Sequence, residues 1–334
     1  MINIAIIGYG YWGPNLLRNF LNNSKCNLKW CCDIKKERLE ILKKSYPNIN
    51  VTTDYKDILK NKTIDAIVIA TPLDTHYFIA KEAIILGKHV LIEKPFTSNV
   101  KQAEALINLA QKHNVIIMVG HTYLYSPSIL KIKDILNNNE LGDLHYINSM
   151  RTHFGHIRPQ ESVCWDLASH DLSIIFFLLK KYNYTIFCSG IDSLNRGHID
   201  TANIVIKFNG SLPIVYLFTS WLAPIKIRNM IIKGSKKMIS LNDLTDKDRI
   251  KIYNQKVLIK NSKTLNEREW NYYQGDVLSP DLDDYEPLSA EIDDFLSCII
   301  YNKEPRSNVF IALNVIKGLE AINKSLIKNK EISV

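Results

Sequence analysis

The chain has 334 residues, of which 46% are hydrophobic and 23% are charged. This length and composition are typical of a globular protein with two domains and exclude a disordered or fibrous chain. The formal net charge of +8 comes largely from scattered lysines, with isolated doublets such as Lys35-Lys36 and Lys236-Lys237. We therefore expect a solvated basic surface and predict no nucleic-acid partner, because such partners require a clustered basic patch.

Cysteine usage and the start of the chain bear on its compartment. The six cysteines form no C-x-x-C pair and no His/Cys cluster with zinc-ligand spacing, so no metal site is predicted. The chain opens directly on a strand-like apolar run, without the pattern of a signal peptide. No apolar run approaches the roughly 20 residues that span a bilayer. We expect reduced thiols in the cytoplasm and no membrane partner.

The first third of the chain alternates strand patterns with helix patterns. Apolar runs predict strands at 2–7, 27–33, 64–70, 89–92 and 115–119. Amphipathic segments between them predict helices at 14–20, 35–45, 75–86 and 100–113. This alternation predicts an α/β fold with a doubly wound parallel sheet of the Rossmann type over residues 1–121.

The pattern changes after residue 121, where strand-like runs follow one another. Helices are predicted at 127–136, 165–180, 289–301 and 310–327. Strands are predicted at 144–151, 185–191, 202–208, 214–221, 228–233 and 250–259. Consecutive strands with few helices between them predict an α+β domain with a large, mostly antiparallel sheet over residues 122–334. We expect the polar residues 262–285 to form an irregular surface excursion.

The run Gly8-Tyr9-Gly10-Tyr11-Trp12-Gly13 has the spacing G-x-G-x-x-G, between a predicted strand and a predicted helix. In a dinucleotide site, Gly8 permits the tight turn, Gly10 lets a pyrophosphate approach the backbone, and Gly13 allows close helix packing. Tyr11 and Trp12 lie in the same loop, and the helix start supplies N–H donors for an anion. The alternative is a glycine-rich turn of an unrelated α/β fold.

Asp33 ends the second predicted strand, roughly 20 residues after the glycine motif, as a dinucleotide site requires. Its carboxylate can accept both ribose hydroxyls and would repel a 2′-phosphate, which favours NAD over NADP. Arg38, on the following helix, could weaken that preference. The alternative is that Asp33 merely caps this helix.

Glu93-Lys94-Pro95 directly ends the fourth predicted strand. The carboxyl ends of strands in such a sheet face the ligand crevice, so a lysine there can relay a proton to or from a substrate hydroxyl. The alternative is a surface lysine in a turn, and the residues alone do not decide between the two.

Asp166 and His170 are four positions apart near the start of the helix predicted at 165–180. This spacing places both side chains on one helix face, where the carboxylate can orient the imidazole as a second acid/base group. The alternative is a helix-entry aspartate and a core histidine.

Together these residues resemble the Gfo/Idh/MocA family of oxidoreductases over nearly the whole chain. The resemblance includes the glycine motif, Ala70-Thr71-Pro72 with His76, Glu93-Lys94-Pro95, and the pair Asp166 and His170. The closing part, from Glu286-Pro287-Leu288 and Glu291 to Glu320, is also similar to the family's C-terminal pattern.

The resemblance implies an NAD-dependent sugar oxidoreductase with roles for individual residues. Lys94 matches the catalytic lysine, often followed by a cis proline, and Asp166 with His170 matches the acid/base pair. Thr71, Pro72 and His76 match the loop along the nicotinamide end of NAD. Glu93 and Lys94 lie where the nicotinamide ribose is usually contacted. The open sheet of the second domain commonly makes homodimers or homotetramers in this family.

Three runs, 10–15, 120–125 and 165–171, are similar to bacterial members of the family that oxidise the C3 hydroxyl of a UDP-N-acetylhexosamine or a related uronate. Side chains with hydroxyl or phosphate-binding groups near the expected cleft are candidates for the sugar pocket. They are Tyr123, Tyr125, Arg151, His153 and Arg158. The rivals are a ketosugar reductase, an inositol or free-sugar dehydrogenase, and a non-catalytic NAD- or sugar-responsive regulator, which would need no proton relay.

Overall fold

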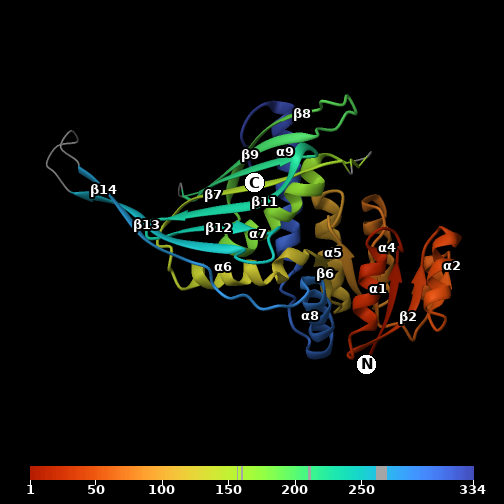
Figure 1. The fold of residues 1–334 in the computed structure, drawn as a ribbon. Helices are drawn as coiled ribbons and strands as arrows, with labels where there is room; N and C mark the ends of the chain where they lie inside the picture. The colour runs from red at the N-terminus through yellow and green to blue at the C-terminus, as the bar shows by residue number, and fades with distance from the viewer. Residues whose placement is uncertain (156, 159–160, 210–211, 261–268) are drawn as a thin grey trace. The chain divides into compact units, whose positions relative to one another are not determined.

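The structure is a computed structural model that describes residues 1–155, 157–158, 161–209, 212–260 and 269–334. The chain forms two compact units (Figure 1). The first unit comprises Met1–Ser126 and Tyr285–Lys317, and the second comprises Pro127–Asp284 and Gly318–Val334. Residues 285–317 thus group with the N-terminal part, a feature that the sequence did not indicate. A domain boundary after residue 121 stays a prediction.

The first unit contains a six-stranded sheet with the order β3-β2-β1-β4-β5-β6, and all its strand pairs are parallel. Its strands are β1 Ile2–Ile7, β2 Cys26–Cys32, β3 Asn50–Thr52, β4 Ala66–Ile69, β5 His89–Glu93 and β6 Ile117–Gly120. The central strand β4 is buried at every position, as expected for a parallel sheet covered on both faces. The predicted doubly wound Rossmann sheet is confirmed.

The helices of the first unit lie between these strands or after them in the chain, and the side chains of Asp54 and Asn99 cap the starts of two of them. These helices are α1 Gly13–Leu21, α2 Lys36–Ser45, α3 Tyr55–Lys60, α4 Leu73–Ile85, α5 Val100–His113 and α8 Pro287–Tyr301, with a short 3-10 helix η1 Thr122–Tyr125. The Asn99 side chain accepts a hydrogen bond from the Gln102 N–H and starts α5, while Asn114 ends it in the left-handed conformation, with φ 53°.

The second unit contains a nine-stranded sheet with the order β14-β13-β12-β11-β7-β10-β9-β8-β15. Its strands are β7 Leu144–Phe154, β8 Tyr184–Ile191, β9 Thr201–Phe208, β10 Ile214–Ser220, β11 Leu222–Gly234, β12 Met238–Asn242, β13 Ile250–Lys260, β14 Glu269–Leu278 and β15 Ile332–Ser333. Among the described strand pairs of this nine-stranded sheet, β7 with β10 is the one parallel pair, so the predicted large, mostly antiparallel sheet is confirmed.

The second unit contains three helical segments in addition to this sheet. A further helix is divided between the two units after Lys317. The three are α6 Pro127–Asn137, the π-helix η2 Cys164–Ala168 and α7 Ser169–Leu179, and the further helix is α9 Val309–Lys328. Apart from three polar residues in its first turn and Ser173, α7 is apolar, and most of its residues are buried.

The prediction of an irregular excursion over residues 262–285 is wrong in part. Glu269–Leu278 forms β14, which pairs with β13 and projects with it from the rest of the sheet in Figure 1. This strand lies at the sheet edge with Trp270 and Tyr272 more than half exposed, so it lacks the apolar alternation of a half-buried strand. Residues 261–268 of the excursion lie outside the described residues. Five further short elements were not predicted: β3, α3, η1, β12 and β15.

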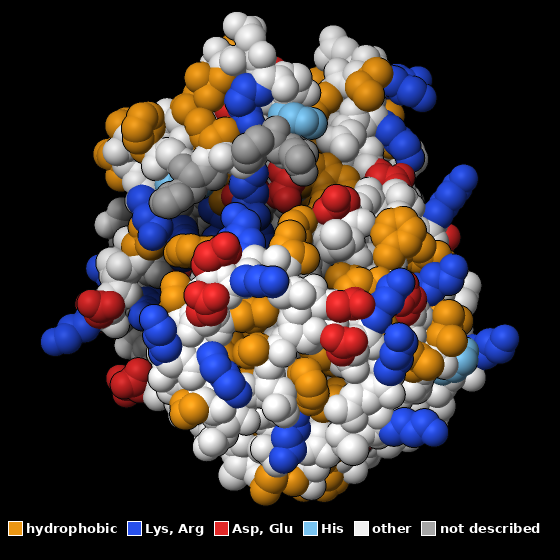
Figure 2. All heavy atoms as spheres, turned by 90° about the vertical axis from the view of Figure 1, so that its right-hand side faces the viewer, with side chains coloured by type: hydrophobic (Ala, Val, Ile, Leu, Met, Phe, Trp, Pro, Cys, Tyr) orange, Lys and Arg blue, Asp and Glu red, His pale blue; other side chains and the backbone are white. Residues whose placement is uncertain are grey.

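On the face shown in Figure 2, lysine and arginine side chains are spread among acidic, apolar and neutral ones. None of the helices in the described ranges is long and apolar enough to cross a bilayer.

Candidate active site

The glycine loop follows β1 and opens α1, as the motif predicts. Gly8 has a φ of +103°, and a Cβ added there would lie 2.4 Å from the carbonyl oxygen of Ala70. A Cβ on Gly13 would lie 2.9 Å from the oxygen of Gly8. No side chain caps the start of α1, Pro14 has no N–H, and the Asn15 N–H donates to the Trp12 carbonyl oxygen at 3.1 Å. The N–H groups that suit a bound anion are therefore those of the glycine loop just before Pro14. Tyr11 is almost fully exposed, and Trp12 is about one third exposed.

A substitution at Gly8 tests whether this close approach shapes the loop. We expect Gly8→Ala to lower the free energy of unfolding by roughly 2–5 kcal/mol, since the backbone angle is strained for alanine and the new Cβ overlaps Ala70. Gly87→Ala is the matched control, because Gly87 also has a positive φ, +72°, but open space around its Cβ position. It should cost only about 1–2 kcal/mol. Urea unfolding measures both, and equal losses would contradict the packing argument.

Asp33 directly follows β2 and is held in a defined orientation. Its Oδ2 accepts the Tyr9 backbone N–H at 2.7 Å, and its Oδ1 accepts the Lys35 N–H at 2.9 Å. The Arg38 guanidinium on α2 forms an ion pair with Oδ2 at 3.1 Å, and it lies 3.7 Å from a Cβ position on Gly10. Asp33 does accept one N–H near the start of α2, but it also accepts the Tyr9 N–H of the glycine loop.

Thr71 and Pro72 lie in the loop between β4 and α4, and His76 lies in the first turn of α4. The buried His76 imidazole lies between two backbone carbonyls, with Nε2 2.9 Å from the Thr71 oxygen and Nδ1 3.0 Å from the Pro95 oxygen. Burial lowers the pKa of His76, and these carbonyls oppose the shift. His76 therefore links the loop after β4 to the segment after β5. The Lys94–Pro95 peptide is cis, as the resemblance implied.

Glu93 and Lys94 come at the carboxyl end of β5, beside the end of β6. The Lys94 backbone N–H donates to Glu93 Oε2 at 3.3 Å. The Glu93 carboxyl lies against Gly120, where an added Cβ would be 3.0 Å from Oε2. Burial raises the pKa of Glu93 to about 7, although the Lys94 charge and backbone N–H and the Trp12 side chain favour its charged form. The lysine is therefore flanked by a carboxyl that titrates near neutrality.

Two further titratable groups in the first unit were not predicted as site residues, although one of them, Glu291, lies in the run that resembles the family's C-terminal pattern. His121 follows β6 directly, and Glu291 lies on α8. Burial, and to a smaller extent the Lys94 charge, lowers the pKa of His121 to about 3. Burial raises the pKa of Glu291 well above its usual range, and the Glu93 carboxyl adds to this. The position of His121 at a strand end could have indicated it, whereas nothing local marks Glu291.

The structure places the two predicted tyrosines differently. Tyr123 in η1 is half-buried, which leaves part of its surface accessible. Tyr125 is fully buried, its hydroxyl donates to Asp294 Oδ2 at 2.7 Å, and the same hydroxyl accepts the Ser307 N–H at 3.1 Å. The Arg306 guanidinium lies 4.9 Å from its ring centre. Tyr125 thus packs inside the first unit, and we leave it out of the proposed sugar contacts.

In the second unit, Asp166 is a nearly buried carboxylate in η2. Its Oδ2 accepts the indole N–H of Trp221 at 3.2 Å, and its Oδ1 forms an ion pair with Arg158 Nε at 3.1 Å. His170 is half-buried in the first turn of α7. A π-helical turn, not the predicted regular α-helix, separates the two residues, and such turns are frequent at functional sites. The structure thus brings Asp166 together with Arg158, two of the predicted residues.

Arg151 lies on β7 and is committed to a buried ion pair. Its Nε and Nη2 donate to the two carboxyl oxygens of Asp171 at 3.0 and 3.2 Å, and Ser149 donates to the same carboxylate at 2.9 Å. Because side chains alternate along a strand, His153 lies on the same face of β7 as Ser149 and Arg151. Arg151 therefore joins β7 to α7, and of the two arginines Arg158 is the exposed one.

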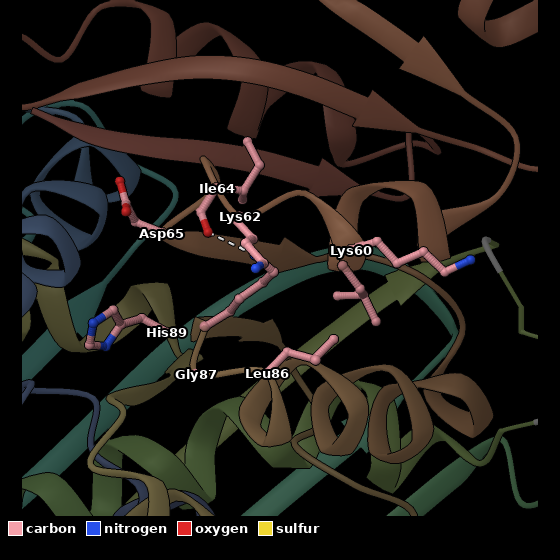
Figure 3. A pocket seen from close by; sticks show the side chains of 9 residues that line it. Lys60, Lys62, Ile64, Asp65, Leu86, Gly87 and His89 are labelled. Atoms are coloured by element: carbon pink, nitrogen blue, oxygen red, sulfur yellow. Dashed lines mark hydrogen bonds between the residues drawn. The ribbon is translucent and has the colours of Figure 1, made fainter.

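A hollow of about 370 Å³ lies at the opposite edge of the first sheet, before β4 and β5 (Figure 3). Its lining residues include Lys60, Lys62, Asp65 and His89. The Lys88 ammonium at this edge donates to the carbonyl oxygens of Asn61 and Ile64, each at 2.8 Å. Ligands of such sheets bind at the carboxyl ends of the strands, so this hollow is not the predicted dinucleotide site. In the described ranges, no group of three or more His, Cys, Asp and Glu side chains could hold a metal ion.

A parallel sheet with a glycine loop, an oriented Asp33 and a lysine at a strand end defines a dinucleotide-binding Rossmann domain. Residues 2–121 match the model of the GFO_IDH_MocA family, described as "Oxidoreductase family, NAD-binding Rossmann fold". Residues 2–121 are thus similar to the NAD-binding Rossmann domain of this oxidoreductase family, and the resemblance seen in the sequence is confirmed over these residues.

Several curated proteins are similar to parts of the chain. An uncharacterized oxidoreductase, YrbE of Bacillus subtilis, is 27% identical over 63% of this chain and 65% of its own length. The NADP-dependent scyllo-inositol 2-dehydrogenase IolW of the same species is 27% identical over 49% and 44%. The UDP-N-acetylglucosamine 3-dehydrogenase of Acidithiobacillus ferrooxidans is 34% identical over 34% and 36%. The chain thus matches less than two thirds of the length of each of these relatives.

The similarity of fold extends over the whole chain. A crystal structure of that UDP-N-acetylglucosamine 3-dehydrogenase superposes with a TM-score of 0.82, at 22% identity, and the match covers 97% of both chains. At this identity the superposition establishes the fold of both units and leaves the substrate open.

Proposed function

We propose that this protein is an NAD-dependent oxidoreductase that transfers a hydride between a sugar carbinol carbon and the nicotinamide. The observation that carries the proposal is the placement of Lys94 at the end of β5, on the same sheet edge as the glycine loop and Asp33. The match of residues 2–121 to an NAD-binding oxidoreductase family supports it.

The residues present fit a bound dinucleotide. Gly8 and Gly13 let the loop pack closely against Ala70 and against its own backbone. A Cβ on Gly10 would lie 3.7 Å from the Arg38 guanidinium, so the Gly10 backbone and the loop N–H groups can approach a pyrophosphate. Asp33 is oriented to accept ribose hydroxyls, which favours NAD over NADP. Thr71, Pro72 and His76 would follow the nicotinamide half. When bound, NAD supplies the acceptor of the hydride.

The chain's own residues would move the proton. In the oxidation, Lys94 or His170 would take the proton of the substrate hydroxyl, and in the reduction the same group would return it. The nearly buried Asp166 carboxylate is one turn before His170 and would hold the imidazole in its working orientation. Lys94 belongs to the first unit and His170 to the second, and both are candidates for the principal base.

For the substrate, we propose a nucleotide-linked amino sugar oxidised at C3, such as a UDP-N-acetylhexosamine. A diphosphate needs a cationic partner, and the half-exposed Arg158 guanidinium offers donors beyond its ion pair with Asp166. Tyr123 and His153 remain proposed sugar contacts. The similarity to a UDP-N-acetylglucosamine 3-dehydrogenase supports this choice, while the scyllo-inositol dehydrogenase represents the rival substrate class.

Substrate profiling with an Arg158 variant tests this choice. We expect NADH formation with UDP-N-acetylhexosamines, and a rise of roughly 10- to 100-fold in their KM in Arg158→Ala, the loss of one charged hydrogen-bond partner. Arg249→Ala is the control, because the Arg249 guanidinium bonds the Thr245 carbonyl elsewhere in the second unit. Activity on free inositols or hexoses at micromolar KM, with no response to nucleotide sugars, would move the assignment to the rival class. NAD binding with no turnover of any sugar would favour a regulator.

We further propose a homodimer or homotetramer in a reducing compartment, the cytoplasm. All six cysteines are free and buried, which suits reducing conditions. Apolar side chains of β14, among them Trp270, Tyr272 and Leu278, are more than half exposed and would gain from burial against a second copy. Light scattering at several protein concentrations measures the oligomer, and a monomer throughout would contradict this proposal.

A further inference from the structure

Three titratable side chains lie near one another in the first unit: Glu93 on β5, His121 after β6 and Glu291 on α8. We call them the carboxyl–imidazole cluster. The Lys94 charge acts on Glu93 and His121, and the Glu93 carboxyl acts on Glu291. His121 is 1% exposed and Glu291 is 0% exposed. Among the described residues, neither His121 nitrogen, neither Glu291 oxygen, nor Glu93 Oε1 has a hydrogen-bond partner of good geometry. Buried polar atoms without partners are costly, so their protonation states decide how the cluster is stabilised.

The two carboxyl groups cannot both be ionised at low cost, because two like charges in a buried site repel each other. Glu93 has the better surroundings for a negative charge, since the Lys94 charge, the Lys94 N–H and the Trp12 side chain all favour it. Glu291 is opposed by Glu93 and Asp294, and only the nearby Thr122 hydroxyl favours its ionised form. The proton of the pair therefore belongs on Glu291.

The remaining groups around Glu291 do not change this balance. The neighbouring His121 is uncharged at neutral pH, because burial and the Lys94 charge disfavour its imidazolium form. The Tyr125 hydroxyl and the Arg306 backbone N–H both donate to Asp294 Oδ2, at 2.7 and 2.9 Å. The charge of Asp294 in turn disfavours a charge on Glu291.

We propose that Glu291 is a positioning residue that keeps its proton at neutral pH and leaves Glu93 as the single carboxylate facing Lys94. A second negative charge beside the lysine would hold its ammonium more firmly and make it a poorer proton relay. The inference rests on the proposed function for the role of Lys94. Its tests need no turnover, so they can be read even where that function fails.

Infrared spectroscopy of protein labelled with ¹³C at the glutamate carboxyl tests where the proton lies. At pH 8 the wild type should show the C=O stretch of one protonated glutamic acid. Glu291→Gln should abolish this band, whereas Glu93→Gln should retain it. Glu331→Gln is the control, because a hydrogen bond from Lys207 lowers the pKa of the exposed Glu331. No band in the wild type, a band that survives Glu291→Gln, or a band that Glu93→Gln also removes would each overturn the proposal.

The pH dependence of stability gives a second test with a defined sign. Above the unfolded-state pKa of about 4.3, a folded state that keeps the Glu291 proton binds one proton more than the unfolded state. Its stability relative to Glu291→Gln therefore falls as pH rises. The ratio of the wild-type to the variant unfolding constant should grow about tenfold per pH unit from pH 5 until Glu291 ionises. Urea unfolding at pH 5, 6 and 7 measures it, and a constant ratio would show that Glu291 is ionised in the folded protein.

Discussion

Replacing Lys94 by alanine should lower turnover by roughly 10²- to 10⁴-fold, the range that a positioned acid/base group supplies. The expected loss is this large because Lys94 ends β5 at the edge where the glycine loop and Asp33 meet. NAD binding should change far less, since the glycine loop and Asp33 remain. Stopped-flow measurement of NADH formation, together with a titration of NAD by fluorescence, separates the two quantities.

Two comparisons make this result specific. Lys101→Ala removes an exposed lysine from the first turn of α5 and should retain the wild-type rate. His170→Ala, measured alone and combined with Lys94→Ala, shows whether the two groups act as one unit, because losses of coupled groups do not add. If Lys94→Ala keeps near-normal turnover at every pH tested, the base is elsewhere, and His170 becomes the first candidate.

Replacing Asp33 by serine should change the cofactor preference. The wild type is expected to prefer NAD, because the Asp33 carboxylate would repel a 2′-phosphate. Serine removes that charge and releases Arg38, whose guanidinium pairs with Asp33 at 3.1 Å, to meet the phosphate instead. We expect the ratio of kcat/KM for NADP to that for NAD to rise by roughly 10- to 100-fold, the effect of one or two charged hydrogen bonds.

The control for Asp33 is an aspartate at the other edge of the same sheet. Asp65 precedes β4 and accepts the Asn3 backbone N–H at 2.7 Å, so Asp65→Ser perturbs the sheet without touching the glycine loop. It should leave the cofactor ratio at the wild-type value. A wild type that already uses NADP better than NAD would refute this role of Asp33, and Arg38 would then be the residue that selects the cofactor.

Much of the site could be predicted from local sequence patterns. Gly8, Asp33 and Lys94 each directly follow a strand of the first sheet, and parallel strands bring such positions to one edge. Arg151 shows the limit of this reasoning. Its type suggested a phosphate partner, but its guanidinium is occupied by Asp171, 20 residues away along the chain, and no local pattern indicates that pair.

The sequence by itself determined the backbone architecture, because apolar periodicity, glycine spacing and capping residues act over a few neighbouring positions. Short or exposed elements such as β3 and β14 were missed, since they bury too little apolar surface to leave a pattern. Only the tertiary structure decided which side chains share an environment. Glu291 lies almost 200 positions after Glu93, yet the fold buries both and brings them close enough for their charges to interact. Burial and charge, and hence protonation, depend on such distant neighbours, and a linear pattern does not record them.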